Sequence, residues 1–408
     1  MSRTRVLILA EAVTLAHVAR PVALAAGLDP ARFAVHFATA PRFDALIGPL
    51  GHVRHDLDSI TPVRFLDALD RGAPVYTAAD LRRYVHEDLR LIAEVEPDVV
   101  VGDFRLSLSA SARLAGVPYA TITNVYWSSC ARQRFPLPEL PLTRTLGVRA
   151  AGALFPLARP FAFAAHTIPL NRVRREHGLT SLGTDLRRTY TDADQVLFSD
   201  APELAPPHTL AACHEFLGPV LWSPAVTEPD WLAELPPDRP VVYVTLGSSG
   251  QRRLLDQALR ALAELPVTVV VARAGAEPVP VPLPLPLPLP DNVFMADYLP
   301  GEAVARRAAL VVCNGGSPAV QQALAAGRPV LGLPGNMDQH LSMRSAVAAG
   351  VGLPVRSEHA TAETIARAAR RLLDEPWFRL RAEAMADRFA SYDAPAAFAR
   401  AVARLARG

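Results

Sequence analysis

The feature that most constrains the fold is the alternation of short β-branched or apolar runs with longer stretches of helical period. In the first half of the chain, such runs predict strands at 6–10, 33–38, 98–101, 119–123 and 195–198. Between them, Ala/Leu/Arg-rich stretches predict helices at 15–26, 78–95 and 107–115. This alternation is typical of βα units on a parallel sheet, so we expect a doubly wound α/β domain.

The same alternation begins again after a proline-rich, weakly periodic stretch at 219–240, which we interpret as an interdomain linker. Strands are expected at 241–246 and 267–272, with a helix at 251–264 between them. Further strands are expected at 310–313 and 329–333, each of these two followed by a helix. The chain therefore predicts two successive doubly wound domains, which we place at 1–218 and 241–385. Residues 278–290 carry Pro at every second position and predict an extended surface loop in the second domain.

Composition excludes several classes of protein. All 42 basic residues are Arg, and the chain has no Lys, which excludes Schiff-base chemistry and a P-loop lysine. The formal net charge of +2 includes no long basic block, so we expect no nucleic-acid partner. The three cysteines are far apart in sequence and predict neither a disulfide framework nor a zinc site. We expect them to be reduced in a cytoplasmic protein.

No transmembrane segment is expected. The apolar stretch at 150–170 is interrupted by Arg159, His166 and three prolines, whereas a span needs about 20 largely uninterrupted apolar residues. The first apolar run stops at Glu11 and is too short for a signal peptide. A homodimer is left open.

A glycine-rich turn supplies the clearest candidate for a binding site. The strand expected at 310–313 runs into Asn314-Gly315-Gly316-Ser317 and then into a helix that opens at Pro318. Backbone amides and the positive end of a helix dipole meet there, which favours an anion such as a diphosphate. Taken alone, the pattern also fits a plain strand-to-helix turn.

Two further turns follow strands of the same expected sheet. Asp338 and Gln339 come after the next strand and suit hydrogen bonding to sugar hydroxyls, whereas Gly247-Ser248-Ser249 follows the first strand and offers a second phosphate turn. Ser in the latter also fits an ordinary helix N-cap. Together, the three turns favour a nucleotide-sugar diphosphate as ligand. Asp192-Ala193-Asp194 is interpreted as a turn and not as a metal site, and no metal site is expected.

The segment 296–343 resembles the donor-binding signature of family-1, UDP-glycosyltransferase-like enzymes with the GT-B fold. That signature is close to His-Gly-Gly-x-Gly-Thr-x-x-Glu-Ala-Leu-Ala-Ala-Gly-x-Pro, followed by Asp-Gln. The residues in register are Gly315, Gly316, Ala323, Leu324, Ala325, Ala326, Gly327, Pro329, Asp338 and Gln339. The resemblance implies two Rossmann-like domains facing across a cleft, with a C-terminal helix at 386–408 that crosses back to the first domain.

The resemblance assigns further donor contacts and shows two departures. Tyr298 and Leu299 match the stretch on which the family holds the base. Asn314 replaces the phosphate-binding His, and Gln322 replaces the ribose-binding Glu. An amide can still hydrogen-bond phosphate or ribose but carries no charge, so the departures predict weaker donor affinity or an unusual donor.

The proposed catalytic pair also comes from the resemblance. The family keeps a general-base His in Gly-His-x-x-Pro after the first strand, and His17 matches it, with Ala16 in place of Gly and the Pro displaced to Pro21. The carboxylate that orients this His matches Asp103. Such a carboxylate selects the ring tautomer and stabilises the imidazolium.

We therefore expect an inverting, metal-independent glycosyltransferase without a bound cofactor. It would move a sugar from a UDP- or dTDP-sugar to a hydroxyl of a hydrophobic small molecule, with the apolar segment 126–170 lining the acceptor pocket. The resemblance also leaves open a nucleotide-sugar 2-epimerase and a non-catalytic nucleotide-sugar-binding or activator protein.

Overall fold

The computed structural model describes residues 3–131, 133–247, 251–273, 290 and 292–407. It divides into two compact units, one formed by 1–220 with 392–408 and the other by 221–391. Among the described residues, no helix is both long and apolar enough to cross a membrane. The proline-rich loop expected at 278–290 lies outside the described residues except for Pro290, and so do Ser248 and Ser249.

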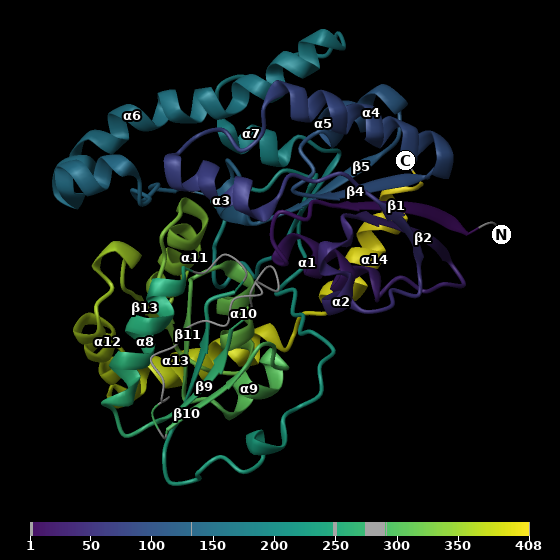
Figure 1. Cartoon of the computed structure of the whole chain (residues 1–408). Coiled ribbons are helices and arrows are strands. Elements are labelled where there is room, and N and C mark those ends of the chain that lie inside the picture. Colours follow the sequence, from purple (N-terminus) through teal and green to yellow (C-terminus); the bar gives the residue numbers. More distant parts are fainter. Residues whose placement is uncertain (1–2, 132, 248–250, 274–289, 291, 408) are drawn as a thin grey trace. The chain divides into compact units, whose positions relative to one another are not determined.

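The first unit is built on a parallel sheet of seven strands in the order β3-β2-β1-β4-β5-β6-β7. Figure 1 labels β1, β2, β4 and β5 of this sheet. The described strands are Thr4–Ala10 (β1), Phe33–Thr39 (β2), Val53–Asp56 (β3), Val99–Asp103 (β4), Tyr119–Thr123 (β5), Gln195–Phe198 (β6) and His214–Phe216 (β7). The described α-helices are Ala16–Ala25 (α1), Asp44–Ile47 (α2), Pro62–Arg71 (α3), Ala78–Val95 (α4), Leu108–Ala115 (α5), Pro141–Glu176 (α6), Leu186–Thr191 (α7) and Ala394–Leu405 (α14).

The second unit repeats the same winding with six parallel strands in the order β10-β9-β8-β11-β12-β13. Its described strands are Val241–Thr245 (β8), Thr268–Ala272 (β9), Val293–Ala296 (β10), Leu310–Cys313 (β11), Val330–Gly332 (β12) and Gly352–Pro354 (β13). Its described α-helices are Arg252–Ala263 (α8), Gly301–Arg307 (α9), Ser317–Ala325 (α10), Met337–Ala348 (α11), Ala362–Asp374 (α12) and Pro376–Phe389 (α13). The expected fold class, two doubly wound parallel sheets, is confirmed.

Each unit has its own apolar core. In the first, α4 and α5 pack on the sheet face that carries Leu7, Leu9 and Val100. In the second, α8 and α12 cover the face that carries Val242 and Val244. The inner strands β4, β9 and β11 are fully buried and rich in Val, as is typical of parallel sheets covered by helices on both faces. These cores hold the strand ends, where the candidate sites lie, in fixed register.

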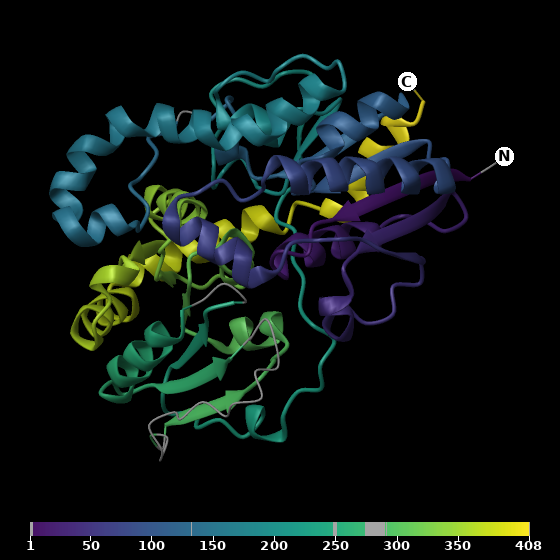
Figure 2. The ribbon, with the colours of Figure 1, turned by 45° about the horizontal axis from the view of Figure 1, so that its top comes forward.

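The helix α6 was not expected from the sequence. Pro156, Pro160 and Pro169 lie inside it, and a proline in a helix interior normally removes a hydrogen bond and breaks or kinks the helix. Pro156 and Pro160 stand at exposed positions, where the freed carbonyl groups can bond water. Gly147, with φ of 74°, bends the chain near the start of α6. The result is two helical segments that meet at a kink at Gly147, teal in Figures 1 and 2, and α6 packs against α4.

Candidate active site

The strand order of the first unit brings the proposed catalytic pair together. β1 pairs in parallel with both β2 and β4, so the connections leave β1 and β4 in opposite directions along the sheet. Ala10 at the end of β1 lies opposite Asp103 at the end of β4, and α1 begins at Ala16. His17 and Asp103 therefore lie at the carboxyl edge where the strand order reverses, the usual ligand-binding position of such sheets.

His17 and Asp103 are in direct hydrogen-bond contact. The distance from His17 Nδ1 to Asp103 Oδ1 is 2.7 Å. Asp103 is fully buried, whereas 20% of the His17 side chain is exposed. When Nδ1 carries its proton and donates to Asp103, the lone pair of Nε2 is free to accept a proton from another molecule. This geometry suits a general base.

Arg20 also binds Asp103, which the sequence did not reveal. Its Nε and Nη2 donate to the two carboxylate oxygens at 3.0 and 2.8 Å, and its Nη1 donates to Asn124 Oδ1 at 3.0 Å. Arg20 stands where the family pattern Gly-His-x-x-Pro has its Pro. It lies three residues after His17, on the same face of α1, and this spacing was the signal available in the sequence.

Phe104 covers one face of the His17 ring. The two rings are stacked, with centroids 4.6 Å apart and an interplanar angle of 16°. Phe104 has a φ of 58°, a conformation that non-glycine residues rarely adopt. The following residue, Arg105, is fully buried and its guanidinium lies 3.7 Å from the Tyr84 ring centroid. Its Nε and Nη1 donate to Asp88 and Glu11 at 2.9 and 3.0 Å.

This ion cluster anchors the backbone that holds Phe104 and therefore fixes the ring that stacks on His17. Burial raises the pKa of Glu11 above its usual value, although Arg105 and the hydroxyls of Ser59 and Tyr84 act in the opposite direction. Ser59 and Tyr84 donate to Glu11 Oε1 at 2.7 and 3.0 Å. The carboxyl thus has partners on both oxygens.

A chain of aromatic side chains leads from His17 to α6. Tyr190 stacks on Phe104 with the ring centroids 5.8 Å apart, and the centroids of Trp127 and Tyr190 are 5.2 Å apart. The ring centroid of Phe135 lies 6.1 Å from that of Trp127, and the ring centroid of Phe163 in α6 lies 4.9 Å from that of Phe135. Apart from Phe104 and Tyr190, these residues fall in the segment 126–170 that was expected to line an acceptor pocket. We call Phe104, Tyr190, Trp127, Phe135 and Phe163 the aromatic chain.

In the second unit, the predicted turns follow adjacent strands. β8, β11 and β12 are neighbours in one parallel sheet, so the residues after them share one edge. Gly247, with a φ of 64°, lies beside Asn314, because a Cβ at Gly247 would be 3.4 Å from Asn314 Nδ2. The turn that begins at Gly247 therefore lies beside the turn that begins at Asn314.

The backbone amides of Gly315 and Gly316 have hydrogen-bond partners within the turn. The Gly316 N–H donates to Asn314 Oδ1 at 3.0 Å, and the Gly315 N–H donates to Cys313 Sγ at 3.3 Å. Gly315 is needed for another reason: its φ is 81°, and a Cβ there would be 2.7 Å from Met343 Cγ. The glycine admits α11 close to the turn. The start of α10 still offers the amides and dipole of a helix N-terminus.

Two of the predicted polar contacts are used within the unit. Gln322 Nε2 donates to Trp222 O and Ser223 Oγ, both at 3.1 Å. Gln339 Oε1 accepts from the Gly335 amide at 3.0 Å and caps the start of α11 together with Asn336. A motif does not show such intramolecular hydrogen bonds, and the roles of Gln322 and Gln339 as ligand contacts stay predictions.

The remaining predicted donor residues differ in accessibility. Asp338, in the first turn of α11, is half-exposed, and Asn314 and Ser317 are 6% and 5% exposed. Leu299 is 2% exposed and belongs to the core, and burial raises the pKa of the partly exposed Tyr298. Next to Gln339, burial, reinforced by Arg356, lowers the pKa of His340 to about 3. His340 is therefore neutral at ordinary pH.

Asp192 and Asp194 have structural partners. Asp192 accepts from Arg113 Nη2 at 2.7 Å and from Arg174 Nη1 at 2.8 Å. Asp194 Oδ2 accepts from the Tyr119 amide at 2.9 Å. These acids hold α5, α6 and β5 together at the start of β6, in agreement with their interpretation as loop residues.

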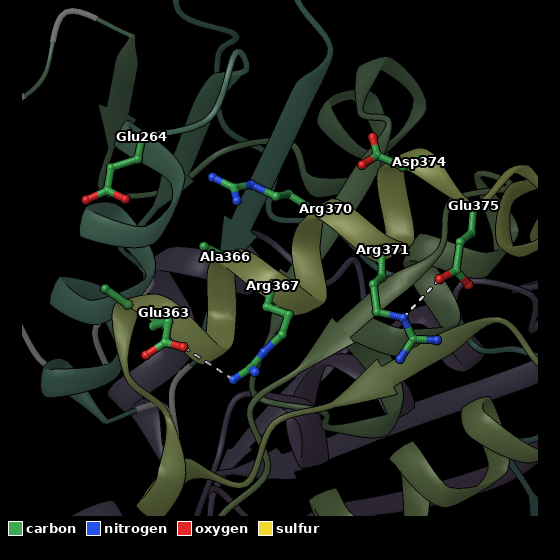
Figure 3. Close-up of a pocket in the computed structure, with 9 residues that line it drawn as sticks. Glu264, Glu363, Ala366, Arg367, Arg370, Arg371, Asp374 and Glu375 are labelled. Atoms are coloured by element: carbon green, nitrogen blue, oxygen red, sulfur yellow. Dashed lines mark hydrogen bonds and ion pairs between the residues drawn. The ribbon is translucent and has the colours of Figure 1, made fainter.

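A depression of about 730 Å³ in the second unit lies beside α12 and the end of α8 (Figure 3). Its lining is mostly charged, and two ion pairs, Glu363–Arg367 and Arg371–Glu375, join residues one helical turn apart. Such pairs are common on solvated helix faces. None of the predicted donor residues that the structure describes lines this depression.

Two doubly wound domains with sites at their strand ends are typical of GT-B glycosyltransferases, and comparison with known proteins shows that the chain belongs to this class. Residues 256–405 match the family model described as erythromycin biosynthesis protein CIII-like, C-terminal domain. The chain belongs to the family-1, UDP-glycosyltransferase-like group of GT-B glycosyltransferases, and it is a glycosyltransferase.

Its similarity to particular enzymes extends over nearly the whole chain. It is 51% identical over 387 residues to the PGL/p-HBAD biosynthesis glycosyltransferase Rv2958c of Mycobacterium tuberculosis strain H37Rv, covering 95% of this chain and 89% of the relative. It is 52% identical to the PGL/p-HBAD biosynthesis rhamnosyltransferase of Mycobacterium bovis BCG, with 95% and 84% covered.

Solved structures share the fold at lower identity. The spinosyn forosaminyltransferase SpnP is 21% identical, with a TM-score of 0.69 and both chains covered in full. The spinosyn rhamnosyltransferase SpnG, complexed with thymidine diphosphate, is 22% identical, with a TM-score of 0.70 and coverage of 97% and 99%.

Proposed function

We propose that the protein transfers a sugar, with inversion and without a metal ion, from a nucleoside-diphosphate sugar to a hydroxyl group of an aromatic or hydrophobic acceptor. The observation that carries this proposal is the contact of 2.7 Å between His17 Nδ1 and the buried Asp103. Nε2 of His17 accepts the hydroxyl proton as the acceptor oxygen bonds to the anomeric carbon. The bond from that carbon to the diphosphate breaks, and the nucleoside diphosphate leaves with the electron pair.

The aromatic chain supports an acceptor with a flat, apolar body. Its rings begin against His17 and offer stacking surfaces, and aromatic pairs contribute about 0.5–1.5 kcal/mol beyond the area they bury. An acceptor hydroxyl bound beside these rings would be near the base. Arg159, which lies 5.2 Å from the Phe135 ring centroid, adds a cation at the far end.

For the donor, the 221–391 unit supplies the candidate contacts. The N-terminus of α10 would stabilise the leaving diphosphate, and Asp338 would bond sugar hydroxyls. The relative described as a rhamnosyltransferase and the SpnG complex with thymidine diphosphate direct the choice of donor. We therefore place dTDP-rhamnose first in a donor panel that also contains UDP-sugars.

The test measures release of nucleoside diphosphate from each donor, with and without a panel of phenolic and other apolar alcohols, in the presence of EDTA. We expect release that depends on an acceptor, persists in EDTA and gives a product of inverted anomeric configuration. Free epimerised sugar formed without an acceptor would favour an epimerase instead. Donor binding without turnover across the panel would favour a non-catalytic binding protein.

A further inference from the structure

The helix α6 exposes an unusual amount of apolar surface. Among the described residues, six of the thirteen exposed large hydrophobic side chains belong to this one helix. Leu157 and Phe161 are 71% and 79% exposed, more than any of the other eleven. Single exposed hydrophobic residues need no explanation, but a contiguous apolar patch on a soluble unit marks an interaction surface.

Four of these side chains form a continuous line along α6. Leu154, Leu157, Phe161 and Ile168 follow one another at intervals of three, four and seven residues, which places them on one face of an α-helix. They are 49%, 71%, 79% and 59% exposed. The opposite side of α6 carries buried residues, including Leu170 and Val173, and packs on its own unit. We call the four exposed residues the α6 stripe.

The charged side chains of residues 140–175, which contain the α6 stripe, are all basic. Asp and Glu are absent from residues 140–175, whereas Arg144, Arg149, Arg172 and Arg175 are exposed on the same helix. Of these, Arg172 pairs with Glu176 at 3.3 Å. Arg144, Arg149 and Arg175 have no acidic partner among the described residues. An apolar face flanked by arginines is complementary to a surface that is apolar inside and anionic outside.

This charge pattern disfavours a second copy of the chain as the occupant. A two-fold pairing of the α6 stripe would bring the Arg172 and Arg175 end of one copy toward the Arg149 end of the other. Glu176, the acid at this end of α6, is already paired with Arg82 and Arg172 and would offset little of the repulsion. Anionic lipid headgroups, in contrast, pair with arginines while the apolar side chains enter the acyl boundary.

The inner side of α6 connects to the candidate active site. Phe163, between Phe161 and Ile168 in sequence, lies 4.9 Å from Phe135 in the aromatic chain that reaches His17. Arg159 lies within 6 Å of both the Phe135 and the Phe163 ring centroids, at 5.2 and 5.8 Å. One helix thus carries an exposed apolar face and an aromatic contact leading toward the base.

We propose that the α6 stripe and its flanking arginines dock this enzyme on the surface of an anionic lipid membrane. The helix lies in the interface, with Leu157 and Phe161 inserted and Arg149 and Arg175 against the headgroups. Docking concentrates the enzyme where apolar acceptors dissolve. This inference does not depend on which sugar is transferred or on His17 being the base.

The test is co-sedimentation of the full-length protein with vesicles of phosphatidylcholine alone or of phosphatidylcholine and phosphatidylglycerol in equal amounts. We expect binding to the anionic vesicles that weakens as salt is raised. The Leu157→Ser/Phe161→Ser variant should bind about tenfold more weakly or worse, because it removes the two most exposed apolar side chains. Arg149→Gln/Arg175→Gln should reduce the preference for anionic over neutral vesicles.

Matched controls replace equally exposed residues elsewhere. Val63→Ser/Leu380→Ser changes side chains that are 69% and 58% exposed, and Arg388→Gln/Arg400→Gln removes two exposed arginines. Both controls should bind vesicles like the wild type, and circular dichroism should show every variant folded. Wild-type protein left in the supernatant, or equal losses in control and stripe variants, would overturn the proposal. So would a dimer in light scattering that Leu157→Ser/Phe161→Ser dissociates without any wild-type binding to vesicles.

Discussion

At the scale of single residues, the unexpected feature is that Asp103 contacts both His17 and Arg20 through its carboxylate oxygens. Arg20 occupies both carboxylate oxygens, and its Nη2 also lies 3.0 Å from His17 Nδ1. If Nδ1 lost its proton, it would accept from Arg20, and Nε2 would then carry the ring proton and be unable to act as a base. The competition between Asp103 and Arg20 for Nδ1 therefore decides the tautomer on which the proposed mechanism depends.

Replacement of Arg20 by Met should destabilise the protein by about 3–5 kcal/mol, because it leaves a fully buried carboxylate without its main partner. The free energy of unfolding in urea measures the loss. Arg71→Met is the matched control, since its ion pair with Asp67 is exposed and should be worth less than about 1 kcal/mol. Similar losses in the two variants would show that Arg20 does not support Asp103 as described.

His340 should make the protein sensitive to acid. Its folded-state pKa is lowered to about 3, below its ordinary value, so the folded form stays neutral while the unfolded form takes up a proton below pH about 6.5. Stability is therefore lost as pH falls from about 6.5 toward 3. The fall in Tm between pH 7 and pH 5 should be smaller in His340→Met than in the wild type. His177→Met, which changes an exposed histidine, is the control and should show the same fall in Tm as the wild type. A fall in Tm of His340→Met as large as that of His177→Met would contradict this account.

At the scale of elements, strand ends position the sites, but the hydrogen bonds and packing of each turn decide what its residues do. Gly315 matches a phosphate-binding motif, yet its conformation and its contact with Met343 serve the packing of α11. Gln339 matches a sugar-binding motif, yet its side chain caps that same helix. Fewer groups are consequently available to bind a ligand than the motif alone suggests.

Gly315→Ala should destabilise the protein by about 1–3 kcal/mol from its positive φ alone, with a further loss from the clash with Met343. Gly152→Ala is the control, because its Cβ would meet nothing within 4 Å. In the interior of α6 that change should stabilise the helix by about 0.5–1 kcal/mol. Thermal unfolding distinguishes the two, and a neutral Gly315→Ala would exclude the packing role.

At the scale of the whole molecule, the fold class was predictable because the strands are short, β-branched and separated by helices of clear period. The helices α4 and α8 and the strands β5, β6 and β11 lie within a residue or two of their expected bounds. α6 was not predictable, since its three prolines argue locally against a helix, whereas its packing on α4 and α7 is a long-range feature of the folded unit. Short strands such as β3 and β7 carry too little alternation to be recognised.

The candidate site was likewise predictable from the sequence only in part. His17 and Asp103 could be paired because a known motif fixes their positions after β1 and β4. The stacking of Phe104 and the aromatic chain could not, because residues such as Trp127 and Tyr190 are far apart in sequence and meet only in the folded unit. Their roles in acceptor binding stay predictions.

The most direct test of the central claim compares the turnover of His17→Ala with that of the wild type at saturating donor and acceptor, with donor affinity measured by calorimetry. General-base catalysis is worth about 10²–10⁴ in rate, so turnover should fall by that factor while donor affinity stays within about twofold. His177→Ala, which changes an exposed histidine at the end of α6, should retain wild-type turnover. A His17→Ala enzyme that turns over at the wild-type rate would contradict the account.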